Sequence, residues 1–221
     1  MNDRLPIALL LFAGLAPAEA APLPDHTAPA GTYRLEKAHA SLVFRIDHLG
    51  YSRYTAQFTD FDAELEFRPD DPEAMSVTVT IDPRSLALNK PPKGFHDTLM
   101  GPEWFDTDNF PQISFKSIAV ERNGPSTMRV TGEMTMLGTT APLVLDATFN
   151  GGYAGFRPYD PNARIGFSAH GSLHRSDWGL VVGLPPEGTN LGVGDIVEFF
   201  IEAEFSGPPT PPDPPSQQDT P

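Results

Sequence analysis

The sequence contains no cysteine in 221 residues, so neither disulfide bonds nor thiolate metal sites contribute to its structure. Basic residues are also scarce: 15 Lys and Arg stand against 29 Asp and Glu, for a formal net charge of −14 at pH 7. Because nucleic acids bind basic surfaces, we do not expect a chain with this acidic net charge to bind nucleic acid. After the first twenty residues no apolar run is long enough to span a bilayer, so we expect no stable membrane insertion.

Sequence motifs of common catalytic sites are missing as well. The chain has no G-x-S-x-G pattern, no P-loop and no zincin motif, and its Asp and Glu residues lie mostly on the polar faces of expected strands. His170 and His174 share a strand face, but no third ligand with convincing spacing accompanies them. We therefore expect no metal site, no cofactor and no enzymatic activity.

The two ends of the chain differ from the rest. Residues 1–20 join Arg4 to an apolar run and to Ala18-Glu19-Ala20, as in a secretory signal peptide whose mature protein begins near Ala21. Because Asp3 offsets Arg4, an uncleaved amphipathic anchor is the alternative. We expect a periplasmic or secreted protein with a lead-in at residues 21–30. Residues 207–221, "GPPTPPDPPSQQDTP", indicate a disordered Pro-rich tail, or else a spacer or docking ligand.

The residues between these ends, 31–206, are enough for one domain with a core. Polar and apolar residues alternate along most of this domain, which is typical of antiparallel sheets with one wet and one dry face. Strands in this number close into a barrel or pack as a sandwich, and the pattern alone does not choose between them. The expected strands cover residues 42–48, 58–67, 76–82, 113–120, 128–136, 143–149, 164–174 and 195–205.

Two segments break the alternation. In residues 93–105, "KGFHDTLMGPEWF", Phe95, Leu99 and Met100 follow helical spacing and Pro102 ends the helix. This spacing predicts a short helix across one end of the sheet structure. Residues 175–191 are rich in Gly and Pro, so we expect a long loop at a rim there.

The stretch "SLVFRIDHLG" places Leu42, Phe44, Ile46 and His48 on one face of an expected strand. That face either packs in a filled core or lines a cavity, because an eight-stranded barrel is just wide enough for side chains or for one small ligand. His48 ends the inward face, where a barrel would open. Its ring either donates a hydrogen bond to a carbonyl or phosphate head group or caps the strand.

Several motifs occur in an order and spacing that resemble one family. The most specific are "HDTLMGPEWFDTDNFPQISFKS" and "RIGFSAHGSLHRSDWGL", and together with "YRLEKAHASLVFRIDHLG" and "VGDIVEFFIEAEF" they resemble the YceI-like family of secreted polyisoprenoid-binding proteins. The resemblance covers residues 33–205. It implies an all-β fold: an extended, lipocalin-like, eight-stranded antiparallel barrel with a short helix near one end. It also implies export to the periplasm, an apolar tunnel for an isoprenoid chain, and no assigned reaction.

The resemblance favours a cavity over a filled core, and two of its departures bear on the cavity's width. Trp104 and Trp178 stand where the family usually has Phe, and their larger rings would narrow the interior. The ligand-binding residues that we expect are Phe44, Ile46, His48, Phe58, Leu65, His96, Leu99, Trp104, Phe115, Phe167, Arg175, Trp178 and Phe199.

Two of these residues have alternative roles. His96, with Asp97, forms a rim site or only fixes the helix on the barrel. Arg175 binds a phosphate bidentately or holds a turn through an Arg–Asp pair. The sequence leaves both questions open.

Our functional hypothesis is an exported lipid-binding carrier that holds a long-chain polyisoprenoid, quinone-like or prenyl phosphate-like, in an apolar barrel. Apolar burial alone stabilises such a complex by roughly 25 cal/mol per Å² before ordering costs. The alternative is an exported stress-response or interaction module with a packed barrel and no bound lipid. A hydrolase or redox enzyme acting on a bound lipid is a third hypothesis. Which lipid is bound, and whether two copies form a homodimer, are open at this stage.

Overall fold

The computed structural model describes residues 22–24, 26–157 and 159–209. The expected signal peptide and residues 210–221 of the expected tail lie outside these ranges. The strands are β1 (Gly31–His48), β2 (Ser52–Phe58), β3 (Phe61–Phe67), β4 (Ser76–Ile81), β5 (Leu86–Ala87), β6 (Ile113–Arg122), β7 (Thr127–Met136), β8 (Thr139–Tyr153), β9 (Asn162–His174) and β10 (Val193–Pro209). The helices are α1 (Phe95–Met100) and three short 3₁₀ helices, η1 (Pro72–Ala74), η2 (Pro83–Ser85) and η3 (Arg175–Trp178).

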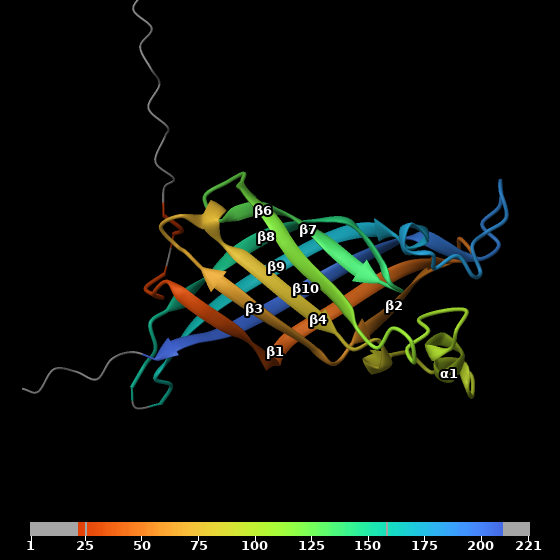
Figure 1. Cartoon of the computed structure of the whole chain (residues 1–221), viewed down its shortest axis with the longest axis horizontal. Coiled ribbons are helices and arrows are strands. Elements are labelled where there is room, and N and C mark those ends of the chain that lie inside the picture. The colour runs from red at the N-terminus through yellow and green to blue at the C-terminus, as the bar shows by residue number, and fades with distance from the viewer. Residues whose placement is uncertain (1–21, 25, 158, 210–221) are drawn as a thin grey trace, which may run out of the picture.

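Eight of the strands close into a barrel (Figure 1). Their order is β10-β9-β8-β7-β6-β4-β3-β1, every pairing is antiparallel, and β1 also pairs with β10. The closing ladder runs from Arg34 opposite Ser206 to His48 opposite Val193. The expected eight-stranded antiparallel barrel is therefore confirmed, and so is the short helix near one end.

Alternation along the strands explains which side faces inward. In β3 every apolar residue from Phe61 to Phe67 is buried, whereas the acidic residues between them face outward. β7 and β8 follow the same rule, with buried Met, Val, Leu and Ala at every second position. Because successive strand side chains point to opposite faces, this pattern commits one face of the sheet to the barrel interior.

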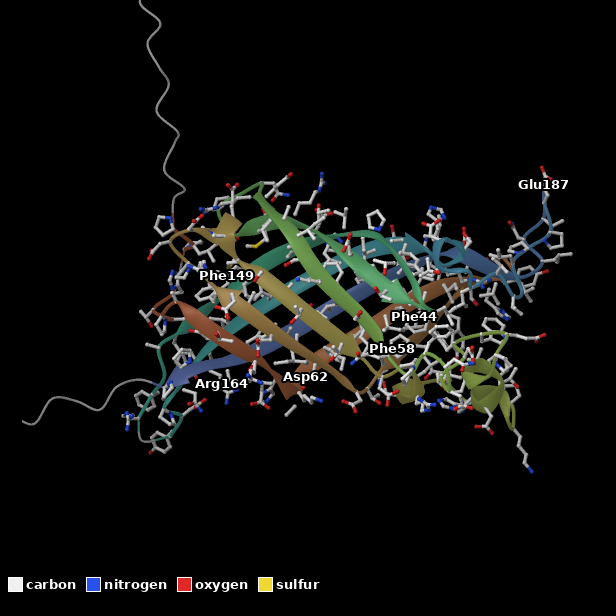
Figure 2. All side chains as sticks on the ribbon, viewed as in Figure 1. Phe44, Phe58, Asp62, Phe149, Arg164 and Glu187 are labelled. Carbon is white, nitrogen blue, oxygen red and sulfur yellow. The ribbon has the colours of Figure 1, made fainter. Side chains whose placement is uncertain are left out.

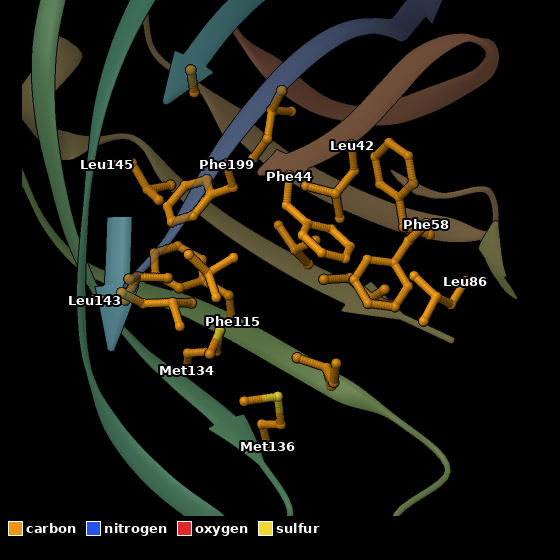
Figure 3. Close-up of a pocket in the computed structure, with 18 of the residues that line it drawn as sticks. Leu42, Phe44, Phe58, Leu86, Phe115, Met134, Met136, Leu143, Leu145 and Phe199 are labelled. Atoms are coloured by element: carbon orange, nitrogen blue, oxygen red, sulfur yellow. The ribbon is translucent and has the colours of Figure 1, made fainter. Parts of the chain in front are cut away.

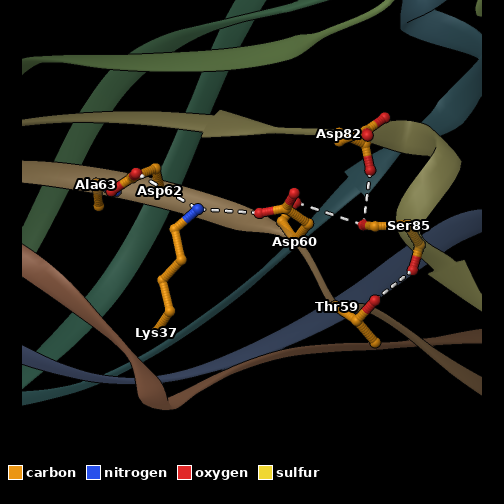
Figure 4. Close-up of polar contacts among 7 residues, drawn as sticks. All are labelled: Lys37, Thr59, Asp60, Asp62, Ala63, Asp82 and Ser85. Carbon is orange, nitrogen blue, oxygen red and sulfur yellow. Dashed lines mark hydrogen bonds and ion pairs between the residues drawn. The ribbon is translucent and has the colours of Figure 1, made fainter.

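β1 changes partners along its length. Its start, from Gly31 to Arg34, pairs with β3, whereas its second half, from Leu42 to His48, pairs with β2. A bulge between Leu35 and Ala40 separates the two parts. At this bulge the Lys37 ammonium lies 3.0 Å from Asp60 and 3.5 Å from Asp62, and so ties β1 to the start of β3 (Figure 4).

The sheet therefore carries a two-stranded extension, β2 and β5, beyond the closed barrel at one end. This extension was not expected. The strand expected over residues 58–67 is wrong at its start, because Phe58 ends β2 and a turn at Thr59 and Asp60 precedes β3. The inward side chains of β2 include Tyr54 and Ala56, which are only weakly apolar, so the alternation is faint there.

The two ends of the barrel are built differently. The lead-in segment lies at one end, and α1 and the loop that follows η3 lie at the other (Figure 1). Figure 2 shows Phe149 and Arg164 toward the first end, Phe44 and Phe58 nearer the second, and Glu187 at its tip. The turn between β1 and β2 lies at the second end as well, beside the loop that follows η3. The Leu49 N–H in this turn donates to the Gly192 carbonyl in that loop at 2.9 Å.

The described residues of the lead-in pack on the barrel. Leu23 and Ala28 are buried in the main core. The His26 ring contacts Phe67 and Phe149 edge-on, with centroids 5.9 Å away in each case. These contacts bury apolar side chains at the end of the barrel that the strands alone would leave exposed to water. The described lead-in residues thus close one end of the barrel.

The expected tail boundary at residue 207 is also wrong, because β10 continues to Pro209, opposite Asn162. Gly207 packs against the ring of Tyr33. Tyr33 is fully buried, and its hydroxyl donates to the Pro29 carbonyl at 2.7 Å. Burial raises the pKa of Tyr33 to about 12, so the phenol stays protonated and keeps this hydrogen bond at physiological pH.

We predict that Gly207→Ala destabilises the barrel. A Cβ atom at this position would overlap the buried Tyr33 ring, and such overpacking costs about 1–3 kcal/mol. Urea unfolding followed by circular dichroism measures the change. The control is Gly166→Ala in β9, whose added Cβ meets only the Asn150 Cβ at an ordinary 3.7 Å. Equal stability of the two variants would show that Gly207 is not packed in β10.

Candidate ligand-binding cavity

The barrel encloses a cavity of about 680 Å³, within the range of roughly 300–1,000 Å³ typical of small-molecule sites. Its wall is almost entirely apolar, and Figure 3 shows Phe, Leu and Met side chains from several strands converging on it, among them Phe44, Phe115, Leu143 and Phe199. A barrel whose interior is filled by its own side chains, as the alternative hypothesis required, does not have such a space. The packed interior of that alternative is therefore wrong, and its stress-response or interaction role stays a prediction.

The cavity is long. On β10 the lining residues run from Val193 to Phe205, a stretch of roughly 40 Å at about 3.3 Å per residue. With strands tilted at about 40° to the barrel axis, this is roughly 30 Å along the axis. That length matches the hydrocarbon core of a bilayer, about 30 Å. A volume of about 680 Å³ spread over this length forms a narrow channel rather than a compact pocket.

Methionine contributes an adaptable part of the wall. Met75, Met128, Met134 and Met136 all line the cavity. The unbranched thioether adjusts its shape at low cost, so such surfaces accept ligands that differ in detail.

Most of the expected ligand-binding residues do line this cavity. Those that line it are Phe44, Ile46, His48, Phe58, Leu65, Leu99, Trp104, Phe115, Phe167, Arg175 and Phe199. His48 is exposed as well as cavity-lining, so it lies at the opening, where the end of the inward face of β1 predicts it. Whether any of these side chains contacts a ligand stays a prediction.

Two expected residues are placed elsewhere. Trp178 is only 1 % exposed and does not line the cavity, because its indole packs in the core and donates to the Met134 carbonyl at 2.9 Å. His96 of α1 also lies off the cavity, whereas its neighbours Phe95 and Leu99 line it. A helix turns successive side chains to different faces, so only one side of α1 can face the interior. Of the two indoles expected to narrow the cavity, only Trp104 lines it.

Among the lining residues that sequence reasoning missed, one group forms a wall without regular structure. After β5 the chain runs along the cavity from Leu88 to Pro92 before α1 begins. Asn89 fixes this segment, since its N–H donates to the Tyr54 hydroxyl at 2.8 Å and its amide to the Thr55 carbonyl at 3.2 Å. No periodicity marks such a segment. The only signal in the sequence is Pro91-Pro92 beside an expected helix.

Arg175 forms the most connected polar group of the wall. Its guanidinium donates to the carbonyls of Leu180, Val182, Val193 and Gly194, the last three at 2.9 Å. The side chain is 3 % exposed, and burial lowers the pKa of its guanidinium despite the nearby Asp195. Four of its five N–H donors are used, so neither expected role, a bidentate phosphate contact or a pair with Asp177, fits.

Asp195 fixes the same region from the outer side. Its carboxylate accepts hydrogen bonds from the Ser176 N–H and hydroxyl, both at 2.9 Å, and lies 3.0 Å from Nδ1 of His174. Burial opposes ionisation, but these hydrogen bonds outweigh it and hold the pKa of Asp195 below its usual value. The arrangement joins η3 to β10, so the rim of the cavity is a fixed structure.

Several other polar groups of the described residues lie outside the cavity. His170 and His174 are exposed outside the cavity, and within the described ranges no three His, Asp or Glu side chains are grouped as metal ligands. A second hollow of about 320 Å³ on the outer surface includes Asp60, Asp62 and Asp82. Lys37 pairs with the first two, and the Ser85 hydroxyl donates to the backbone carbonyl of Asp82 (Figure 4). The backbone N–H of Arg84 donates to the Asp82 carboxylate.

A closed antiparallel barrel around a long apolar cavity defines a class of proteins that hold apolar molecules inside a single sheet. Residues 33–205 match the YceI-like domain family. The chain belongs to this family. A similar relative is the protein YceI of Salmonella arizonae, 35% identical over 180 residues that cover 80% of this chain and 88% of the relative.

Two solved structures share the fold. BcnA of Burkholderia cenocepacia superposes with a TM-score of 0.65 at 23% identity, over 77% of this chain and 98% of BcnA. A polyisoprenoid binding domain from Saccharophagus degradans superposes with a TM-score of 0.58 at 13% identity, over 80% of this chain and 98% of that domain. Separately, none of the helices among the described residues is long and apolar enough to cross a membrane.

We predict that Arg175→Lys destabilises the protein by about 2–4 kcal/mol, because an ammonium group cannot reach all four carbonyls and leaves buried acceptors unpaired. Thermal and urea unfolding measure this change. The control, Arg129→Lys, alters an exposed arginine whose ion pair with Asp146 spans 3.6 Å, and we expect it to change stability by less than about 0.5 kcal/mol. A similarly small effect at Arg175 would contradict its role in holding the rim.

Proposed function

We propose that this protein is an exported, non-enzymatic lipid carrier that holds one long polyisoprenoid chain inside its barrel. The observation that carries the proposal is the long cavity of about 680 Å³, whose wall consists almost entirely of apolar side chains. Membership of the YceI-like family and the likeness to a structure named as a polyisoprenoid binding domain support it.

The shape of the cavity favours a chain over a compact ligand. A channel roughly 30 Å long suits an extended hydrocarbon, and each CH₂ group transferred from water stabilises the complex by about 0.8 kcal/mol. Since a long chain contains many such groups, its affinity does not depend on many polar contacts. A quinone-like or a prenyl phosphate-like molecule meets this requirement.

The carrier role follows from the enclosure. A long isoprenoid is insoluble in water, and the barrel covers it with apolar surface on all sides, while acidic residues on the outer face keep the complex in solution. Export fits the Ala18-Glu19-Ala20 pattern near the start of the chain. Binding rather than catalysis fits a wall that presents few reactive groups to the ligand.

The direct test is extraction of protein purified from the organism that makes it, followed by mass spectrometry of the extract. We expect a prenyl chain at close to one copy per protein. Recovery of no prenyl or acyl chain from several independent preparations, each with a folded barrel by circular dichroism, would overturn the proposal.

A matched pair of variants tests where an apolar ligand binds. Ala169 lines the cavity, so the variant Ala169→Phe places a ring inside it. If this ring removes about 55 Å² of contact between the probe and the wall, the affinity for the probe falls about tenfold. Ala119 is exposed on the outer face of β6, and Ala119→Phe should leave binding unchanged. The measurement is titration with the neutral fluorescent probe N-phenyl-1-naphthylamine. Equal affinities in both variants would place the probe outside the barrel.

A further inference from the structure

The side chains lining the cavity that can carry charge at physiological pH are all basic. His48, Lys90 and Arg175 line it, but no Asp or Glu does among the described residues. This is the reverse of the whole chain, in which acidic residues outnumber Lys and Arg by 29 to 15. An apolar interior excludes both signs alike, so desolvation does not explain why only groups that can carry positive charge are present.

These three side chains belong to one end of the cavity. His48 is the last residue of β1 and pairs with Val193. The carbonyl of Val193 accepts a hydrogen bond from Arg175 at 2.9 Å. Arg175 and His48 are therefore joined through a single residue of β10.

Lys90 reaches the same end from the other side of β1. Tyr54 of β2 lies opposite Ile46, two residues along the strand from the pair His48 and Ser52. The Tyr54 hydroxyl accepts from the N–H of Asn89 at 2.8 Å, and Lys90 is the next residue. The rim thus follows a continuous path from Arg175 through His48 and Tyr54 to Lys90.

Lys90 is free to meet a ligand. It is exposed, and no carboxylate among the described residues forms an ion pair with it. Its φ of 47° and the following Pro91-Pro92 restrict the backbone, so the flexible side chain leaves the backbone from a defined point. Arg175 has one unused N–H and lies 5.9 Å from the centroid of Trp104, which also lines the cavity.

We infer that this rim binds an anionic head group, a phosphate or a carboxylate, whose apolar chain occupies the barrel. The inference rests on the proposed function and names the class of lipid: an anion rather than a neutral quinone or alcohol. Lys90 and His48 would contact the anion through charge-assisted hydrogen bonds, and Arg175 would position the rim and add positive charge. Such a local cluster is needed because the chain as a whole, at −14, repels anions.

The test compares probes with one chain and different head groups. Binding of geranylgeranyl monophosphate, geranylgeraniol and inorganic phosphate is measured by isothermal titration calorimetry on the mature protein. We expect the monophosphate to bind at least about tenfold more tightly than the alcohol, as a charge-assisted contact provides. Inorganic phosphate should show no saturable binding at millimolar concentration. Palmitate against hexadecanol repeats the comparison for a carboxylate.

Variants locate the effect. Lys90→Met keeps the apolar stem and removes the charge, and His48→Gln keeps a hydrogen-bonding group without positive charge. Each should weaken monophosphate binding by about three- to tenfold, in line with a partly exposed charged contact, and leave the alcohol unchanged. The control is Lys116→Met, which removes one exposed charge from the outer face of β6 and should change neither affinity.

Each contrary result has a separate meaning. Equal binding of monophosphate and alcohol would overturn the anionic head group and leave the carrier proposal intact. No binding of either prenyl compound by a folded barrel would overturn the carrier proposal itself. Tight binding of inorganic phosphate would assign the rim to the free ion instead of a lipid. An equal loss in Lys116→Met would show a general field effect and no local site.

Discussion

The pairing of β1 with β10 is the constraint on which the rest of the structure depends. It joins the first and last strands of the described chain and turns an open sheet into a closed one. An open sheet would leave two edges with unpaired backbone groups and an apolar face exposed to water. Closure removes both problems at once, and it also creates the interior space that a packed pair of sheets would not have.

The length of β1 makes the two ends of the barrel unequal. Near its start β1 pairs with β3, and near its end it pairs with β2, so the wall at the second end includes an extension and an irregular segment. Tyr33, Phe67 and Phe149, together with the lead-in, fill the first end with aromatic rings. A chain-like ligand therefore has an apolar closed end and a rim with hydrogen-bonding groups, which supports one direction of binding.

The wall of the cavity is almost entirely apolar. The stability of a bound chain and the recognition of its head group would therefore depend on different residues. Deep apolar lining stabilises any hydrocarbon of suitable length in proportion to buried area. A head group that stays at the rim, as we propose, would not touch this lining and would not be distinguished by it. In the binding mode that we propose, discrimination would fall to the few polar side chains at the rim, where Arg175 and Asp195 make hydrogen bonds to neighbouring backbone. The two tasks are performed by different parts of one sheet.

Local sequence rules predicted a large part of the fold and less of the site. Strands such as β3, β7 and β8 follow a period of two, so their inward faces, including Leu65, were predictable. β2 and the packed lead-in were not, because Tyr54, Ala56 and His26 become part of the wall or the core only through distant partners. His96 and Trp178 were assigned to the site from motifs, but helix rotation and core packing turn them away from the cavity.

By itself, the sequence determined the strand faces, the short helix and the apolar character of the interior, since each depends on neighbours within a few residues. The tertiary structure alone decided that the interior is hollow, that Arg175 is satisfied by backbone carbonyls, and that Lys90 and His48 line the same cavity. Those features depend on contacts between residues far apart in the chain, such as Val193 with His48. No local pattern encodes which distant strands meet when a sheet closes on itself.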